Sequence, residues 1–331
     1  MEKDEKIFVA GHEGMIGSAI LRCLREDGFT NLVIRTASEL DLTNQKMVFD
    51  FFMDEKPDYV FLAAAKMGGI LANSRYPAKF IYNNIQSQTN VIHSAWKSGV
   101  KKLLFLGSSC VYPKGCPQPM KEEYLMSGKL EPTSEPYAIA KITGIKMCQS
   151  YNSEYGTDYI SVVPADLYGP NDDFDPETSH VLPALIRKMH QAKIGNKHEV
   201  VVWGTGSPRR EYLYVDELAD ACVFLMNNFD EPEMINVGSG EDLSIKELAL
   251  LIKDVVGFDG AIIFDESKPD GAPRKLLDSS KIRKMGWVRK TNLEKGIRQT
   301  YQWYINRSPG SHSEPKAKNL TLRAGSVTEE S

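Results

Sequence analysis

KIFVAGHEGMIGSAIL, residues 6–21, joins an apolar run to a helix-like run through a loop that contains Gly11, Gly14 and Gly17. The apolar residues before the loop predict a buried strand, and those after it predict an amphipathic helix. A glycine-rich turn in this position lets the backbone approach a pyrophosphate, and the following helix offers its N-terminal N–H groups and its dipole. The spacing differs from the common G-x-G-x-x-G fingerprint, so a tight turn without a ligand is the alternative.

The alternation of strand and helix continues through the first half of the chain. Apolar runs recur as NLVIR, YVFLAAA, KLLFLGSS and YISVVPA, and none of them alternates with polar residues. Such runs are typical of strands that are buried on both faces of a parallel sheet. Amphipathic stretches such as SAILRCLRED and TNVIHSAWKSG lie between them. The pattern predicts an α/β fold with a doubly wound parallel (Rossmann) sheet, and we expect residues 1–170 to form this dinucleotide-binding domain.

After residue 170 strand-like and helix-like runs no longer alternate regularly. A helix (VLPALIRKMHQA), a strand (EVVVWG), two more helices and several short strands follow. They predict a smaller α/β substrate domain over residues 171–306, partly interleaved with the first. Residues 307–331 are polar and without periodicity, and we expect them to form a disordered tail.

The composition of this 331-residue chain excludes several classes of protein. A formal net charge of -4 gives no electrostatic reason to expect nucleic acid or an anionic membrane as a partner. No apolar run is long enough to span a bilayer, and the charged start MEKDEK lacks the apolar region of a signal peptide. The five cysteines are odd in number and scattered, so we expect neither a disulfide framework nor a metal site. A cytoplasmic location with reduced thiols is the expectation.

The end of the second predicted strand bears on the choice of nucleotide. A carboxylate there would bind the ribose 2′-OH of NAD, whereas an arginine would accommodate the 2′-phosphate of NADP. The segment NLVIRTASEL offers Arg35 and has no carboxylate before Glu39. This favours NADP, although Glu13 in the glycine-rich loop favours NAD instead.

A candidate catalytic set follows the fourth predicted strand. LFLGSSCVYP brings Ser108 and Cys110 to the carboxyl end of that strand, where open α/β sheets bind their ligands. In EPYAIAKITG a helix begins near Pro136, and Tyr137 and Lys141 share one face because they are one turn apart. At a nicotinamide, such a tyrosine would donate a proton to a forming alkoxide, the lysine would lower the tyrosine pKa, and the serine would orient the carbonyl oxygen. Alone, the tyrosine and lysine could equally be a solvated pair without a role.

Together these segments resemble the extended short-chain dehydrogenase/reductases, and in particular the members that epimerise and reduce GDP-4-keto-6-deoxy-D-mannose. The resemblance runs from about residue 6 to about residue 306. It is carried by FVAGHEGMIGSAI, AAAKMGGI, KLLFLGSSCVYP, EPYAIAKITGIK, LYGP, SHVLPAL, VVVWGTGSPRREYL and KPDGAPRKLLD. It implies an enzyme that binds NADP(H) and a GDP-sugar, inverts the sugar at C3 and C5, and reduces it at C4 to give GDP-L-fucose. We also expect a homodimer, because the helices that hold catalytic residues in this family often pack against a second copy.

The resemblance assigns catalytic roles to five residues. It implies Ser108, Tyr137 and Lys141 for reduction, and Cys110 and His180 for epimerisation. The sugar protons at C3 and C5 lie α to the C4 ketone, and a thiol and an imidazole on opposite faces of the ring can both act near neutral pH. Taken singly, the cysteine could be a small buried apolar residue and the histidine an ordinary residue at a helix start.

The resemblance also implies two binding sets. The cofactor set comprises Gly11, His12, Glu13, Gly14, Met15, Ile16, Gly17, Arg35, Leu106, Gly107, Ser108, Ser109, Lys141, Pro164, Ala165, Asp166, Leu167 and His180. The GDP-sugar set comprises Lys188, Trp203, Arg210 and Asp270. An arginine suits a diphosphate because its planar fork forms bidentate bonds, and a tryptophan offers an aromatic face. The aspartate could instead form an ordinary Asp-Gly turn.

Several positions depart from the family pattern. Glu13 stands where family members commonly have a basic residue, and members often have another basic residue near the position of Ala37. In the loop after the fifth strand, Ala165 and Asp166 replace the threonine and asparagine of PTNLYGP. Two alternatives therefore remain open: another nucleotide-sugar 4-epimerase or reductase, and a divergent paralogue that binds nucleotide but turns over poorly.

Overall fold

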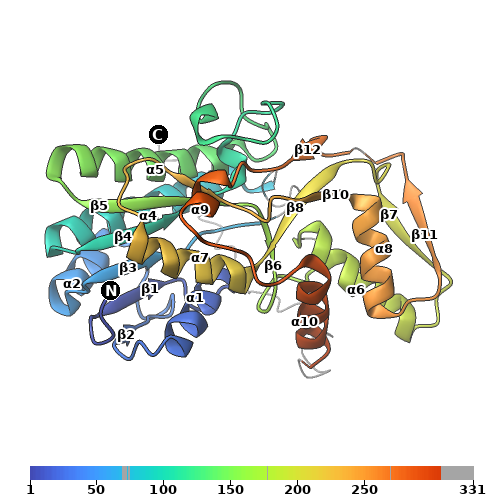
Figure 1. Ribbon diagram of the computed structural model, residues 1–331, viewed down its shortest axis with the longest axis horizontal. Coiled ribbons are helices and arrows are strands. Elements are labelled where there is room, and N and C mark those ends of the chain that lie inside the picture. The colour runs from blue at the N-terminus through green and yellow to red at the C-terminus, as the bar shows by residue number, and fades with distance from the viewer. Residues whose placement is uncertain (69–72, 74, 177, 269, 307–331) are drawn as a thin grey trace, which may run out of the picture.

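The computed structural model describes residues 1–68, 73, 75–176, 178–268 and 270–306 (Figure 1). The tail expected at residues 307–331 lies outside the described residues. Within the described part, a six-stranded parallel sheet occupies one side of the molecule. Its order is β2 (Leu32–Val33), β1 (Ile7–Ala10), β3 (Tyr59–Leu62), β4 (Lys102–Leu106), β5 (Asp158–Pro164) and β9 (Ile235–Val237). The predicted doubly wound parallel α/β fold is confirmed.

The strand order reverses beside β1. This strand pairs with β2 on one side and β3 on the other, with Ile7 opposite both Leu32 and Tyr59. The carboxyl ends of β1 and β3 therefore frame the crevice in which doubly wound sheets bind nucleotides. β2 is shorter than the predicted run NLVIR, because only two of its residues pair with β1.

Helices cover both faces of this sheet (Figure 1). On one face α4 packs against both of its neighbours, and on the other face α1 packs against α7. The first group is α2 (Gln45–Glu55), α4 (Pro77–Ser98) and α5 (Glu135–Tyr155), and the second is α1 (Met15–Glu26) and α7 (Val215–Asn228). None of the described helices is both long and apolar enough to cross a membrane.

The approach of α5 to β4 depends on Gly144. A Cβ atom at this position would lie 2.2 Å from the ring of Phe105, so any side chain would force the helix away from the strand. The helix has Pro136 in its first turn, as predicted. This close contact brings Tyr137 and Lys141 to the end of β4.

The rest of the chain forms a smaller α/β part with its own core, which includes Leu182, Ile186, Leu248 and Ile297. Its helices are α6 (Val181–Ile194), α8 (Ile245–Val256) and α10 (Leu293–Asn306). Its strands are β6 (Asp166–Tyr168), β8 (Arg209–Tyr214), β10 (Asp242–Ser244) and β12 (Arg274–Lys275) in one sheet, and β7 (Glu199–Trp203) with β11 (Ala261–Asp265) in another.

Later segments return to the larger core. α7 and β9 contribute Leu218 and Val237 to it, and α9 (Ser280–Lys284) contributes Ile282. The chain therefore crosses between the two cores several times after β5. These crossings place β6, β8 and β12 beside the carboxyl ends of β4 and β5, where the candidate site lies.

Candidate active site

The centre of the site lies at the turn after β4. Ser108 precedes the short helix η1 (Ser109–Val111), and its Oγ lies 2.7 Å from the Sγ of Cys110. The backbone N–H of Cys110 also donates to this Oγ at 3.4 Å. The turn therefore fixes the hydroxyl and the thiol in direct contact.

Lys141 is anchored to the same strand end. It is 3% exposed, and its Nζ donates to the carbonyl oxygen of Leu106 at 2.7 Å. The Nζ lies 4.9 Å from the ring centre of Phe105 and 5.8 Å from that of Tyr137. Burial lowers the pKa of Lys141 to about 8, because the ammonium loses hydration in the interior. Burial therefore destabilises the charged form of Lys141, and this ammonium lies close to the Tyr137 ring.

Tyr137 is a buried phenol in this surrounding. It is 8% exposed, and burial raises its pKa far above the usual value. The Cys110 thiol also raises this pKa, whereas the Ser108 hydroxyl lowers it. At neutral pH the phenol is therefore protonated and can donate a proton. The structure brings the four predicted residues Ser108, Cys110, Tyr137 and Lys141 together at one place.

His180 stands apart from this group. It occupies the position before α6 and is exposed. Within the described residues it forms no hydrogen bond to Cys110 or Tyr137. The structure therefore places this predicted residue at a helix start without joining it to the thiol.

The glycine-rich loop has the close approaches that its sequence predicts. Gly11 has a φ of +86°, and a Cβ there would lie 2.7 Å from the backbone of Ala64. A Cβ on Gly17 would lie 2.2 Å from the Gly11 carbonyl oxygen. Gly14 meets nothing closer than 3.5 Å, so packing alone does not require a glycine there. Together with the buried Nδ1 of His12, which has no partner among the described residues, this fits a loop that receives a phosphate-bearing ligand.

A cleft of about 330 Å³ lies beside this loop, at the point where the strand order reverses. Glu13, Arg35 and Ala37 line it together, so the three positions that bear on cofactor choice share one surface. Arg35 is already engaged, because its guanidinium pairs with Glu55 at 2.5 Å. The cleft is also lined by residues that were not predicted: Phe8, Ala10, Leu40, Asp41, Leu42, Ala63, Ala64, Ala65, Lys66, Asn83 and Ser87. The segment AAAKMGG at the end of the third strand was a signal for residues 63–66, whereas Asn83 and Ser87 lie on α4.

The other predicted cofactor residues lie after β5, at the end of β4 and in the first turn of α1. Pro164 ends β5 and Asp166 begins β6, with Ala165 between them. Ala165 is buried, and its N–H donates to the Val237 carbonyl oxygen at 3.0 Å. Met15 and Ile16 lie in the first turn of α1, Leu106 and Gly107 at the end of β4, and Leu167 within β6.

Two of the predicted substrate residues meet at an aromatic surface. Trp203 is 58% exposed at the end of β7, and the Lys188 Nζ lies 5.8 Å from its ring centre. The Nζ of Lys268, a residue that was not predicted, lies 5.7 Å from the centre of the same ring. An exposed indole with two ammonium groups nearby is suited to a planar ring that carries a negative group.

Arg210 lies in β8, and Asp270 lies between β11 and β12. The Arg210 guanidinium donates to the Ala272 carbonyl oxygen at 2.6 Å. Asp270 accepts from the N–H of Thr205 at 2.9 Å and from its hydroxyl at 2.7 Å. Asp270 therefore links the loop before β12 to the loop that contains Thr205.

Comparison with known proteins places the chain among nucleotide-sugar enzymes. Residues 7–238 match the NAD dependent epimerase/dehydratase family. The chain is 63% identical over 305 residues to Putative GDP-L-fucose synthase 2 of Arabidopsis thaliana, which covers 92% of this chain and 93% of that protein. It is 53% identical over 310 residues to GDP-L-fucose synthase of Escherichia coli (strain K12), with 91% and 97% covered. MlghC, a GDP-mannoheptose C4 reductase from Campylobacter jejuni with NADP bound, superposes with a TM-score of 0.85 at 44% identity, over 92% of this chain and 99% of that one.

Proposed function

The chain belongs to the NAD dependent epimerase/dehydratase family, and we propose that it converts GDP-4-keto-6-deoxy-D-mannose to GDP-L-fucose with NADPH as reductant. The observation that carries this proposal is the contact of the Cys110 thiol with the Ser108 hydroxyl beside Tyr137 and Lys141. A reductase alone needs only the serine, tyrosine and lysine. A thiol in the same turn supplies the additional base that epimerisation requires.

Epimerisation comes first. The Cys110 thiolate accepts the proton from C3 or C5, and the electron pair of the broken C–H bond forms an enolate with its charge on the C4 oxygen. The Ser108 hydroxyl and the Tyr137 phenol donate hydrogen bonds to this oxygen, which stabilises the developing charge. A second acid returns a proton to the opposite face of the carbon. His180, on the loop before α6, is the candidate for that acid.

Reduction uses the same oxygen. NADPH would supply the hydride that reduces C4, and Tyr137 donates its proton to the C4 oxygen as the alkoxide forms. Lys141 favours the phenolate left behind, because its ammonium lies next to the ring. The loop of Gly11, His12 and Gly14 would hold the pyrophosphate of the cofactor.

The test uses purified protein, GDP-4-keto-6-deoxy-D-mannose and each reduced nicotinamide in heavy water. We expect stoichiometric loss of NADPH absorbance and GDP-L-fucose with deuterium at C3 and C5. Reduction without deuterium at these carbons would contradict the epimerase step and indicate a C4 reductase. Interconversion without net consumption of NADPH would indicate a 4-epimerase, and nucleotide binding without turnover would indicate the divergent paralogue.

The homodimer is part of the same proposal. α4 and α5 pack side by side, and each exposes apolar side chains, such as Tyr82 at 62% and Ile139 at 39%. We expect sedimentation at micromolar concentration to give twice the chain mass of 37.1 kDa. Ile139→Glu should produce monomers, whereas Ile194→Glu on α6, which is 67% exposed, should not. A monomeric mass for the unmodified protein would contradict the dimer.

We also infer that the protein works in the cytoplasm. All five cysteines are free, which suits a reducing compartment. Fractionation of cells that express the full-length chain tests this inference. Recovery of the chain in a secretory compartment would contradict it.

A further inference from the structure

The Arg210 guanidinium, which the resemblance assigns to the GDP-sugar, is held by two main-chain oxygens. Its Nη1 donates to the carbonyl oxygen of Arg209 at 2.7 Å and to that of Ala272 at 2.6 Å. A Cβ atom on Gly271 would lie 2.9 Å from Nη2, so the loop lies directly against the guanidinium. Among the described residues, Nε and Nη2 have no acceptor. These two nitrogens form one edge of the planar fork, and such an edge can form bidentate bonds to a phosphate.

The two carbonyl oxygens that hold Arg210 come from adjacent parts of one sheet. Arg209 lies in β8, and Ala272 lies shortly before β12, which pairs in parallel with β8. Arg274 lies opposite Arg209 in this pairing, and the N–H of Arg209 donates to the carbonyl oxygen of Pro273 at 2.8 Å. The position of the guanidinium therefore depends on the register between β8 and β12.

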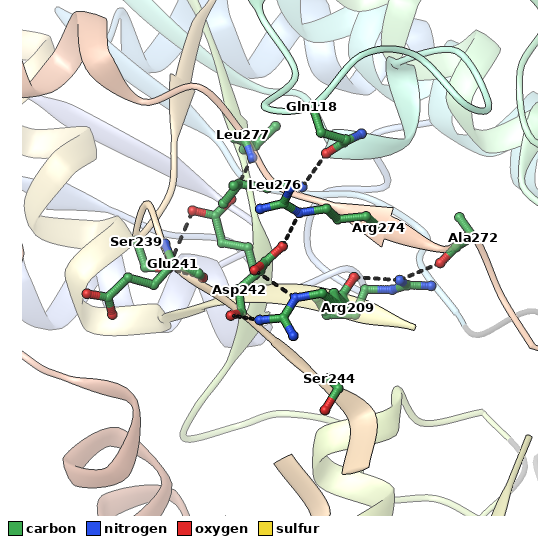
Figure 2. A network of polar contacts seen from close by, with 12 residues as sticks. Gln118, Arg209, Ser239, Glu241, Asp242, Ser244, Ala272, Arg274, Leu276 and Leu277 are labelled. Carbon is green, nitrogen blue, oxygen red and sulfur yellow. Dashed lines mark hydrogen bonds and ion pairs between the residues drawn. The ribbon is translucent and has the colours of Figure 1, made fainter. Parts of the chain in front are cut away.

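Asp242 links these two strands to a third one. It lies on β10, which pairs with β8 on the side opposite to β12. Its carboxylate pairs with Arg209 Nε at 3.0 Å and also with Arg274 Nε, as Figure 2 shows. The Asp242 side chain is 7% exposed, whereas the side chains of Arg209 and Arg274 are 41% and 44% exposed. One buried carboxylate therefore connects all three strands beside Arg210.

Further bonds hold the strands on either side of this carboxylate. The Glu247 carboxylate at the start of α8 lies 3.4 Å from Arg209 Nη1 and accepts from the N–H of Ser244 at 2.7 Å. After β12, the N–H of Leu276 donates to the side-chain oxygen of Gln118 at 2.8 Å (Figure 2). The ion pairs of Asp242 thus lie between α8 and the loop that contains Gln118.

Asp242 has two opposite effects on an anion bound at Arg210. Its negative charge repels the anion, but water and salt screen this repulsion because both partner arginines are partly exposed. Its bonds keep Arg209 and Arg274 together, and without the carboxylate the two guanidinium groups would repel each other. A bidentate bond depends strongly on geometry, so the loss of register should outweigh the loss of repulsion.

We propose that Asp242 is a positioning residue for recognition of the diphosphate of the GDP-sugar: through Arg209 and Arg274 it holds the two carbonyl oxygens that orient Arg210. This rests on the proposed function, in which a GDP-sugar is the substrate. Asp242 acts through the Arg210 guanidinium and does not touch the ligand. Its replacement therefore weakens diphosphate binding although a negative charge is lost.

Calorimetric titration of the full-length protein with GDP tests the proposal without turnover. We expect Arg210→Met to raise the Kd for GDP by at least about tenfold and Asp242→Asn by about fivefold. In the double variant, Asp242→Asn should add less than about twofold, because no guanidinium remains to be positioned. Arg274→Met should follow Asp242→Asn, and Arg274→Lys should restore part of the affinity. Asp254→Asn, on the exposed face of α8, is the control.

Two further measurements separate positioning from a general loss of structure. In turnover, Asp242→Asn should raise the KM for the GDP-sugar by about the same fivefold and leave kcat within about twofold. The Kd for NADPH should stay constant. If Asp242→Asn does not give a cooperative thermal transition, the two Arg274 variants in the presence and absence of Arg210 provide the same test.

The outcomes also separate this proposal from the proposed function. An unchanged or lower Kd for GDP in Asp242→Asn overturns the proposal, because repulsion would then outweigh positioning. An unchanged Kd in Arg210→Met overturns it as well, and so does a rise in Asp242→Asn that persists in the double variant. If the expected coupling occurs in a protein that neither epimerises nor reduces the GDP-sugar, the role of Asp242 holds and the proposed function is lost.

Discussion

The catalytic turn and the cleft beside the glycine-rich loop differ in how much water they admit. Tyr137 and Lys141 are 8% and 3% exposed, whereas Glu13 is exposed and the Arg35 side chain is 36% exposed. Charges in the interior interact strongly, and charges at an open cleft are screened by water and salt. The departures from the family pattern at Glu13 and Ala37 therefore lie where a charge change costs least. Substitutions in the turn should lower the reaction rate by orders of magnitude. Substitutions in the cleft should change the affinity for the cofactor only severalfold.

Tyr137→Phe should have the largest effect of the substitutions considered. The variant removes the proton donor for the C4 alkoxide, and we expect NADPH oxidation to fall by about 10³-fold. Binding of NADPH, measured by fluorescence titration, should stay within about twofold, since the phenol oxygen is not needed to hold the loop. Tyr155→Phe on the exposed end of the same helix is the control. Turnover within tenfold of the unmodified protein would show that another group is the acid.

Cys110→Ser should have the next largest effect. A serine hydroxyl is a much weaker base than a thiolate, so we expect exchange at C3 and C5 to fall by at least about 10²-fold. Mass spectrometry of the sugar after incubation in heavy water measures this, and cofactor binding should be unaffected. Cys116→Ser is the matched control. Normal exchange in the Cys110 variant would remove the thiol from the mechanism.

Glu211 has no role in the proposed reaction, so replacing it tests how burial of a carboxyl group affects the stability of the fold. Burial raises its pKa from 4.5 to about 7, although N–H groups of Leu277 and Gly240 oppose the shift. The folded state therefore binds more protons than the unfolded state between these values. The stability that this carboxyl contributes is fully present below pH 4.5 and is lost as pH rises through 7.

The measurement is chemical denaturation of the unmodified protein and Glu211→Gln at a series of pH values. From acid to neutral pH, the unmodified protein should lose about 3 kcal/mol of unfolding free energy relative to the variant. Glu13→Gln, which changes an exposed carboxylate, should follow the unmodified protein throughout. Parallel curves for the Glu211 variant and the unmodified protein would mean that its carboxylate is well solvated.

The sequence alone predicted those parts of the site whose residues lie close together in the chain. The glycine-rich loop lies within one strand, turn and helix, and Tyr137 and Lys141 lie within one helical turn, so their geometry follows from short spacings. β9 was not predicted, because three buried residues after a polar loop carry no periodic signal. Its place in the sheet depends on pairing with β5, far back in the chain.

β12, which contains Lys275, was not predicted for a related reason. β12 has only two residues, and nothing in PRKLLD indicates which neighbours it meets. Its position is set by Gln118 and Glu211, which are distant in the sequence and are brought together by the crossings between the two cores. The sequence indicated Arg210, but the ion pairs beside it depend on tertiary structure.

The smallest expected effect lies in the cleft, where water and salt screen the charges. Glu13 and Arg35 line one surface, and the Arg35 guanidinium is already paired with Glu55. We expect NADPH to be preferred over NADH only weakly, and Glu13→Arg to lower the KM for NADPH by about fivefold, roughly 1 kcal/mol at an effective dielectric near 20. The KM for NADH should hardly change, and the gain should shrink as salt is added. Glu26→Arg, the same charge change at the exposed end of α1, is the control. If the KM for NADPH stays constant at low ionic strength in Glu13→Arg, the carboxylate does not act on the phosphate, and the weak preference must arise from Ala37 or from the engagement of Arg35 with Glu55.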